Sequence, residues 1–163
     1  MLYRKFNLLV ISFLLMVTAI PAVFSDSGNV VSHSFLKPMP TPGDAPPYSA
    51  YKGVGIGTAM DDARTKLGIP KEKSDTQDFY VFSDDESAIV YYGAEKTVTA
   101  LTVTFTGKLD AAPTAKAVFG EDVPPKPDGG IFKMVRYPKA GFWISYNKIL
   151  GDNHVVMIAM QKM

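Results

Sequence analysis

The chain has 163 residues, and its 17 basic and 16 acidic side chains leave a formal net charge of +1. This balance argues against a nucleic-acid partner, which would call for a basic face, and against electrostatic docking on anionic lipid. Cysteine is absent, so a hydrophobic core without disulfides has to hold the fold, and no cysteine can carry a lipid anchor.

The N-terminal segment has the features of an export signal. Arg4 and Lys5 supply the positive start, and the apolar run over residues 8–20 is too short to span a bilayer. Cleavage is expected after Ser25, which makes residues 1–25 a signal peptide; an uncleaved anchor is the alternative. Without its two basic residues the mature chain has a net charge of about −1. We expect a periplasmic or secreted protein with no stable membrane insertion.

Residues 26–52 are expected to form a flexible leader rich in proline, serine and glycine, before a single domain over residues 53–163. The prolines are Pro38, Pro40, Pro42, Pro46 and Pro47. The glycine run over residues 53–57 matches neither the dinucleotide fingerprint nor the P-loop, so no nucleotide site is expected.

The first half of the domain predicts one helix and three strands. Thr58 is the expected N-cap of a helix that runs to Leu67 and stops at Gly68. The expected strands cover residues 79–82, 88–92 and 97–105. In the last of them apolar residues alternate with threonines, as in an antiparallel sheet that is covered on one face.

The second half predicts the same succession. Asp110 is the expected cap of a helix over residues 111–119 that ends at Gly120, and both the caps and the glycine stops are 52 positions apart. Strands are expected at residues 132–136, 142–146 and 154–160. The predicted fold class is therefore α+β, with two tandem helix-plus-three-strand repeats, about 55–106 and 108–163. Together they would form an antiparallel sheet with the short helices packed on one face.

The run from Gly55 to Pro70, with the strands after it, resembles the helix start of the outer-membrane small-protein-A-like domain. It also resembles the tandem-repeat β-lactamase inhibitor protein fold. Both families pack a helical segment on a small antiparallel sheet, and the second contains the unit twice. Over about residues 53–163 the resemblance implies this architecture and a tendency to bind proteins, and it assigns no individual functional residue.

Two groups of residues are candidates for contact with a partner. An acidic turn, Asp84, Asp85 and Glu86, could reach into a partner's cleft; it lacks the glycine and the distal glutamate of a calcium-binding loop, so no metal is expected. An aromatic group in the second half could anchor an interface or stack on sugar, with ordinary core packing as the alternative. Its members are Tyr137, Phe142, Trp143 and Tyr146.

Alternation along a strand places the neighbours Phe142 and Trp143 on opposite faces, one in the core and one toward solvent.

No group of residues in the sequence indicates a particular reaction. His154 is the only histidine after residue 33, and its spacing from Ser145 or Asp152 does not single out a catalytic set. The predicted function is an exported, non-enzymatic protein-binding module without a cofactor, either an inhibitor or an envelope-assembly adaptor. Its partner would be another exported or envelope protein, contacted at turns 84–86 and 137–141. A glycan or small-ligand binding protein is the alternative, followed by a hydrolase that uses His154 or the acidic turn.

Overall fold

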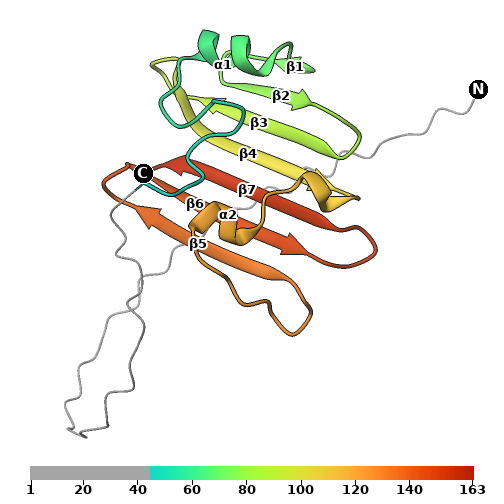
Figure 1. The fold of residues 1–163 in the computed structure, drawn as a ribbon. Coiled ribbons are helices and arrows are strands. Elements are labelled where there is room, and N and C mark those ends of the chain that lie inside the picture. The colour runs from blue at the N-terminus through green and yellow to red at the C-terminus, as the bar shows by residue number, and fades with distance from the viewer. Residues whose placement is uncertain (1–44) are drawn as a thin grey trace, which may run out of the picture. The chain divides into compact units, whose positions relative to one another are not determined.

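A computed structural model describes residues 45–163, so the predicted signal peptide and the first part of the predicted leader lie outside the described residues. The described part is mostly β, with a seven-stranded antiparallel sheet and two short helices (Figure 1). Its elements in chain order are α1 (Met60–Leu67), β1 (Glu72–Lys73), β2 (Gln77–Val81), β3 (Glu86–Tyr92), β4 (Val98–Thr106), a 3₁₀ turn η1 (Leu109–Ala111), α2 (Ala115–Phe119), β5 (Ile131–Tyr137), β6 (Phe142–Ile149) and β7 (Val155–Lys162). The predicted antiparallel sheet with short helices is thus confirmed.

The strands are arranged in the order β1-β2-β3-β4-β7-β6-β5. The last strand of each half therefore lies at the centre of the sheet, where Val103 of β4 is opposite Ile158 of β7. The two ends of the sheet are β1, with two residues, and β5, with seven.

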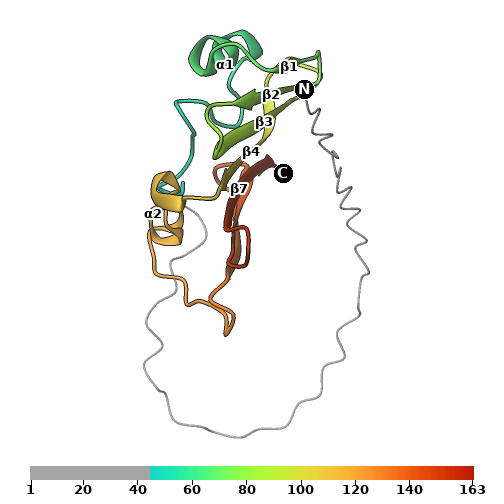
Figure 2. The ribbon, with the colours of Figure 1, turned by 90° about the vertical axis from the view of Figure 1, so that its right-hand side faces the viewer.

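One face of the sheet forms the core. Leu101, Val103 and Phe105 of β4 are buried there, while the threonines between them keep partial exposure. The helices cover this face with their own apolar stripes, Met60, Ala63 and Leu67 in α1 and Ala115, Val118 and Phe119 in α2. Figure 2 shows both helices on the same side of the sheet, and no described segment lies over the opposite side.

Helix α1 begins at Met60, and Thr58 is not its cap. The N-cap position is Ala59, which offers no side-chain acceptor, and the Thr58 hydroxyl accepts a hydrogen bond from the Gly55 amide at 3.1 Å instead. The reason is a pairing with the start of β4. The Thr58 carbonyl accepts from the Val98 amide, and Ala59 bridges Thr97. This pairing holds Thr58 and Ala59 against the start of β4, and Ala59 is extended with ψ 145°, so the helix starts after them.

Helix α2 is shorter than predicted, and Asp110 does not cap it. Thr114 is the N-cap, and its hydroxyl accepts from the Ala117 amide at 3.1 Å. Pro113 disfavours helical dihedral angles in the residue before it, and Ala112 is extended with ψ 131°. The chain can enter the α-helix only after this proline. The predicted stop at Gly120 is confirmed by its left-handed conformation.

The folded part reaches further toward the N-terminus than predicted. Pro46 and Tyr51 are buried, and Tyr51 forms a two-way backbone bridge with Val54. The predicted leader therefore ends earlier than Lys52, because its last residues are part of the core. No helix within residues 45–163 is long and apolar enough to cross a membrane.

Candidate functional site

The uncovered side of the sheet presents a regular array of side chains. Directly opposed residues in an antiparallel sheet share a face, so the pairing register of β2 to β7 forms three complete rows of six residues on this side. A partial row of Thr106, Val155 and Ile149 and, on β1, Glu72 lie on the same side. We call the 18 residues of the complete rows the open face. The rows are Arg136, Trp143, Gln161, Ala100, Tyr91, Gln77; Met134, Ser145, Ala159, Thr102, Ile89, Phe79; and Phe132, Asn147, Met157, Thr104, Ser87, Val81.

The open face is apolar and almost without charge. Arg136 is the one charged residue among the 18, and Glu72 of β1, opposite Phe79, adds a charge at the edge of the same side. Five of the nine large apolar side chains that are exposed in residues 45–163 belong to it: Val81, Tyr91, Phe132, Met134 and Met157. The remaining polar positions carry hydroxyls or amides, which can form hydrogen bonds without the desolvation cost of a full charge.

Side-chain size changes across the open face. In the middle row the two central strands contribute the small residues Thr102 and Ala159, and β4 adds Ala100, while β7 also contributes the larger Gln161 and Met157. Aromatic residues lie on the neighbouring strands, Tyr91 on β3 and Trp143 on β6. A shallow hollow of about 540 Å³ lies at one end of this central pair of strands. Tyr91, Thr99, Ala100, Gln161, Lys162 and Met163 line it.

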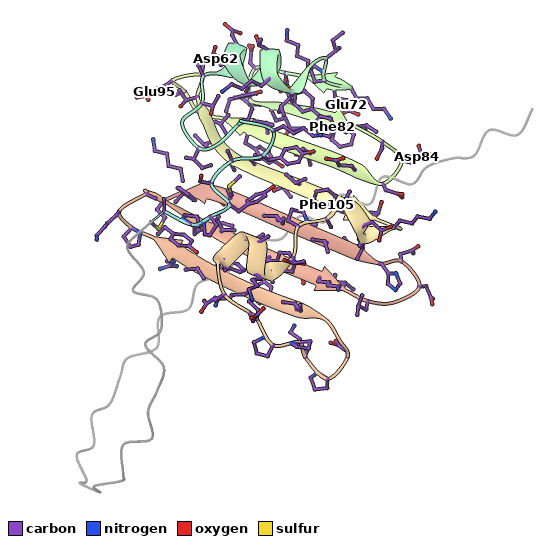
Figure 3. The ribbon with its side chains drawn as sticks, in the orientation of Figure 1. Asp62, Glu72, Phe82, Asp84, Glu95 and Phe105 are labelled. Atoms are coloured by element: carbon purple, nitrogen blue, oxygen red, sulfur yellow. The ribbon has the colours of Figure 1, made fainter. Side chains whose placement is uncertain are left out.

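The predicted acidic turn is not a free acidic cluster. Glu86 is occupied within the molecule: its carboxylate accepts a hydrogen bond from the Tyr51 hydroxyl, and the Lys52 ammonium lies 3.4 Å away. Burial, reinforced by the hydrogen bond to Glu86, raises the pKa of Tyr51. Asp85 is half-buried and its carbonyl accepts from the Thr106 amide, which leaves Asp84 as the exposed member of the turn (Figure 3).

Three of the four predicted aromatic contacts belong to the core. Tyr137, Phe142 and Tyr146 are buried on the covered face, and Tyr146 is only 2% exposed. The rings of Tyr137 and Phe142 lie 6.1 Å apart. Their burial corrects the prediction that they meet a partner, because helix α2 and its flanking segments cover that face. Trp143 lies on the open face with partial exposure, so the opposite orientation predicted for Phe142 and Trp143 is confirmed.

Two of the residues considered for catalysis, His154 and Ser145, are not brought together. His154 precedes β7 and is exposed, and its carbonyl accepts from the Gly107 amide. Ser145 is opposite Ala159, five residues further along β7, which corresponds to about 16 Å. Within residues 45–163 no group of three or more metal-binding side chains occurs.

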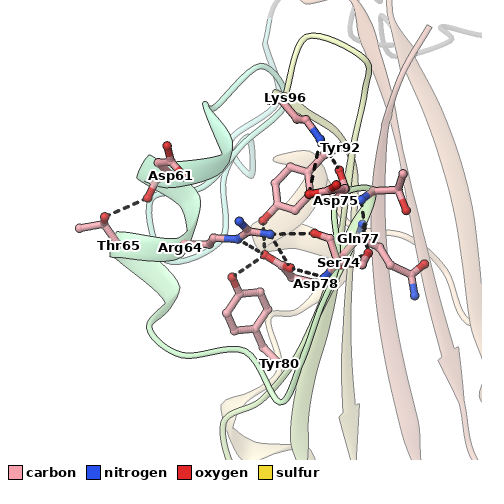
Figure 4. A network of polar contacts seen from close by, with 11 residues as sticks. Asp61, Arg64, Thr65, Ser74, Asp75, Gln77, Asp78, Tyr80, Tyr92 and Lys96 are labelled. Atoms are coloured by element: carbon pink, nitrogen blue, oxygen red, sulfur yellow. Dashed lines mark hydrogen bonds and ion pairs between the residues drawn. The ribbon is translucent and has the colours of Figure 1, made fainter.

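A polar network that the sequence did not reveal lies on the covered face (Figure 4). Asp78 of β2 is completely buried. Its carboxylate accepts from Arg64 of α1 at 2.7 and 2.9 Å, from the Tyr92 hydroxyl at 2.8 Å and from the Ser74 amide at 3.3 Å. Burial alone would raise the pKa of Asp78, but the hydrogen bonds from Arg64 and Tyr92 and the charge of Arg64 hold it below its usual value. Because the partners of this carboxylate are already in place, the network serves to attach α1 to the sheet.

Comparison of the chain with protein families, with curated proteins and with solved structures finds no match. The open face is therefore the feature of the described residues on which a functional proposal has to be built. The sequence signal for such a face was present only in part: the threonines of β4 indicated a wet side, but the register of all six strands was needed to assemble it.

Proposed function

We propose that this protein is an exported, non-enzymatic binding module that holds another protein against its open face. The observation that carries the proposal is the composition of that face, which has one charged residue among 18 and five large apolar side chains exposed to solvent. The centres of protein interfaces are depleted in charged residues and enriched in aromatic residues, methionine and arginine. Extended exposed apolar patches on soluble proteins mark interaction sites.

The aromatic residues on either side of the central strands are the proposed anchors. Tyr91 and Trp143 are in the same row, three strand spacings apart, which is about 14 Å. Arg136 is directly opposite Trp143 on β5. Tyrosine, tryptophan and arginine are the residues most often responsible for binding energy at interfaces. A protruding loop of the partner would sit between the anchors, over Ala100 and Gln161, and would extend over the small side chains Thr102 and Ala159 of the next row.

The compartment and the partner class of this proposal come from the N-terminal sequence. A signal peptide over residues 1–25 would deliver the domain to the periplasm or the medium, where its partner is another exported or envelope protein. The role is that of an inhibitor or of an envelope-assembly adaptor. At the rim, the exposed Asp84 is the member of the acidic turn that remains for contact.

We further propose that the two halves of the domain are copies of one α-βββ unit. In support, each half contains a helix followed by strands, and three neighbouring strands of one half, β2-β3-β4, correspond to three of the other, β7-β6-β5; the two-residue β1 is an addition in the first half. Ala63 and Leu67 in α1 have their equivalents in Ala115 and Phe119 of α2, and all four are buried. Under this proposal the open face arises where two copies join at β4 and β7.

The binding proposal is tested by placing a charge at the centre of the open face. Thr102→Arg should abolish stoichiometric co-purification of a partner from the exported fraction, because it puts a long cation where the face has none. Ile69→Arg is the matched control, since Ile69 is 97% exposed and lies outside the open face. The proposal fails if Thr102→Arg retains the partner as well as the control does, with both variants folded by circular dichroism.

The inhibitor role has its own measurement. A panel of β-lactamases assayed with the wild-type protein and with Thr102→Arg should include a member that only the wild-type protein inhibits. If no member is inhibited while a partner is still captured, the adaptor role is favoured instead.

The hollow beside Tyr91 favours binding of a glycan or a small ligand as a second candidate function. Its volume of about 540 Å³ is in the range of small-ligand sites, and it combines an aromatic ring with the Gln161 amide and the Lys162 ammonium. A glycan array tests this candidate: binding that is lost in Tyr91→Ala would support it, and an array without bound glycans would count against it.

A further inference from the structure

The two edges of the sheet differ in a way that bears on self-association. At one end, β1 has only two residues, both charged, and follows Pro70 closely. At the other end, β5 has seven residues without proline or glycine, and Phe132 and Met134 on it are 55% and 49% exposed. Soluble proteins usually keep edge strands short, charged or interrupted, because a long edge can pair with a strand of another chain. The β1 edge is both short and charged, whereas the β5 edge is long and uninterrupted and carries only Lys133 and Arg136 as charges.

The free backbone groups of β5 can be identified from the hydrogen bonds of the β5–β6 hairpin. The Gly141 carbonyl accepts a hydrogen bond from the Met163 amide, so the backbone groups of Gly141 point toward β7. Along a strand the N–H and C=O groups of successive residues point to opposite sides. Those of Phe142 therefore point toward β5, where Tyr137 is the opposed residue. Every second residue of β5 has the same orientation as Tyr137, so the backbone groups of residues 131, 133, 135 and 137 form the hydrogen bonds to β6. The N–H and C=O groups of Phe132, Met134 and Arg136 then point away from the sheet, and no strand within residues 45–163 pairs with them.

Lys133 would ordinarily protect such an edge. A lysine that points inward from an edge strand discourages pairing, because an added strand would bury its charge. Here the Lys133 ammonium is in an ion pair with the Glu121 carboxylate and lies 5.4 Å from the centre of the Phe119 ring. Its charge already has a counter-charge within the molecule, so an added strand would not leave a lysine ammonium unpaired at the edge.

We propose that a second copy of this chain pairs with β5, antiparallel, about a two-fold axis at Met134. This register is the one that pairs all three outward residues: Phe132 with Arg136 of the second copy, Met134 with Met134, and Arg136 with Phe132. Each of these pairs exchanges two backbone hydrogen bonds, for a total of about six. The register also places each guanidinium beside an aromatic ring rather than beside the other guanidinium.

Self-pairing would double the binding surface. Opposed residues of an antiparallel pair share a face, so the open faces of the two copies would lie on the same side of one continuous sheet. The dimer would then offer two equivalent sites to a partner. An edge contact of seven residues is at the small end of protein interfaces, so the association should be weak and depend on concentration.

Sedimentation velocity over a concentration series tests the dimer, with Met134→Pro as the variant. Proline removes an outward N–H while leaving the β5–β6 bonds in place, and edge positions of this kind tolerate it. Losing one hydrogen bond per copy should weaken dimerisation by about tenfold or more. A wild-type protein that stays monomeric up to about 1 mM would overturn the proposal, since even weak specific association should be visible there.

Cysteine cross-linking keeps the proposal testable if Met134→Pro does not fold. The chain has no cysteine, so Met134→Cys introduces a single thiol at the two-fold axis, where opposed Cα atoms are about 5.5 Å apart, within disulfide range. Met157→Cys is the matched control, exposed on the central strand β7. Mild oxidation should produce disulfide-linked dimers of Met134→Cys and not of Met157→Cys. Equal cross-linking of both variants, or of Met157→Cys alone, would contradict pairing at β5.

Discussion

The guanidinium of Arg64 on α1 donates to both carboxylate oxygens of Asp78 on β2, at 2.7 and 2.9 Å (Figure 4). This two-bond contact is the polar attachment of a helix that is only eight residues long and that could not remain helical alone. The carboxylate is completely buried and the Arg64 side chain is 17% exposed, so the pair is largely removed from solvent.

Breaking this pair should destabilise the fold. Arg64→Met leaves the Asp78 carboxylate buried without its cation, and such changes typically cost about 3–5 kcal/mol. Lys116→Met is the control, because Lys116 and Asp122 form an ion pair at 2.9 Å in which both side chains are well exposed, and such pairs contribute about 1 kcal/mol or less. Urea unfolding measures both values. Equal free energies of unfolding for the two variants would contradict the structural role of the pair.

The stability of the domain should fall in acid because of Asp78. Its pKa in the folded protein is lower than the usual value of 3.8. The contribution of the ionised carboxylate is therefore present above about pH 4 and is lost as the pH falls through the folded-state pKa. The difference in unfolding free energy between the wild-type protein and Asp78→Asn should be constant from pH 7 to about pH 5 and should shrink below pH 4. A difference that stays constant down to pH 2.5 would show that ionisation of Asp78 is not responsible.

The adjacent aromatic residues Phe142 and Trp143 should respond in opposite ways to truncation. Phe142→Ala removes a buried ring from the core and should cost about 3–5 kcal/mol of unfolding free energy. Trp143→Ala removes a partly exposed ring from the open face and should cost about 1 kcal/mol while weakening partner capture. Thermal unfolding and affinity capture on both variants separate the two effects. A larger loss of stability in Trp143→Ala than in Phe142→Ala would be inconsistent with the register of β6.

Helix α2 should depend on its cap. Thr114→Ala removes the acceptor for the Ala117 amide and should reduce the unfolding free energy by about 1 kcal/mol, whereas Thr114→Ser should retain most of it. Asp110→Ala should have little effect, because Asp110 lies in the preceding 3₁₀ turn. The N-cap assignment fails if Asp110→Ala proves the more damaging of the two alanine variants in urea unfolding.

The sequence by itself determined the features that depend on near neighbours along the chain. The alternation of Leu101, Val103 and Phe105 with threonines predicts β4 and its buried side, because successive side chains of a strand point to opposite faces. Gly68 and Gly120 predict where the helices stop, since both adopt positive φ angles that other residues rarely take. The opposite orientation of Phe142 and Trp143 follows from the same local geometry.

Only the tertiary structure decided which local features become surface and which become core. Glu86 belongs to a predicted contact turn, yet its carboxylate accepts a hydrogen bond from the hydroxyl of Tyr51, 35 positions earlier in the chain. Thr58 has the chemistry of a helix cap, yet its carbonyl accepts a hydrogen bond from the Val98 amide and the helix begins only at Met60. The open face exists because β4 pairs with β7, which joins the two halves of the chain. Pairings between distant segments depend on the register of whole strands, and no pattern within one strand specifies them.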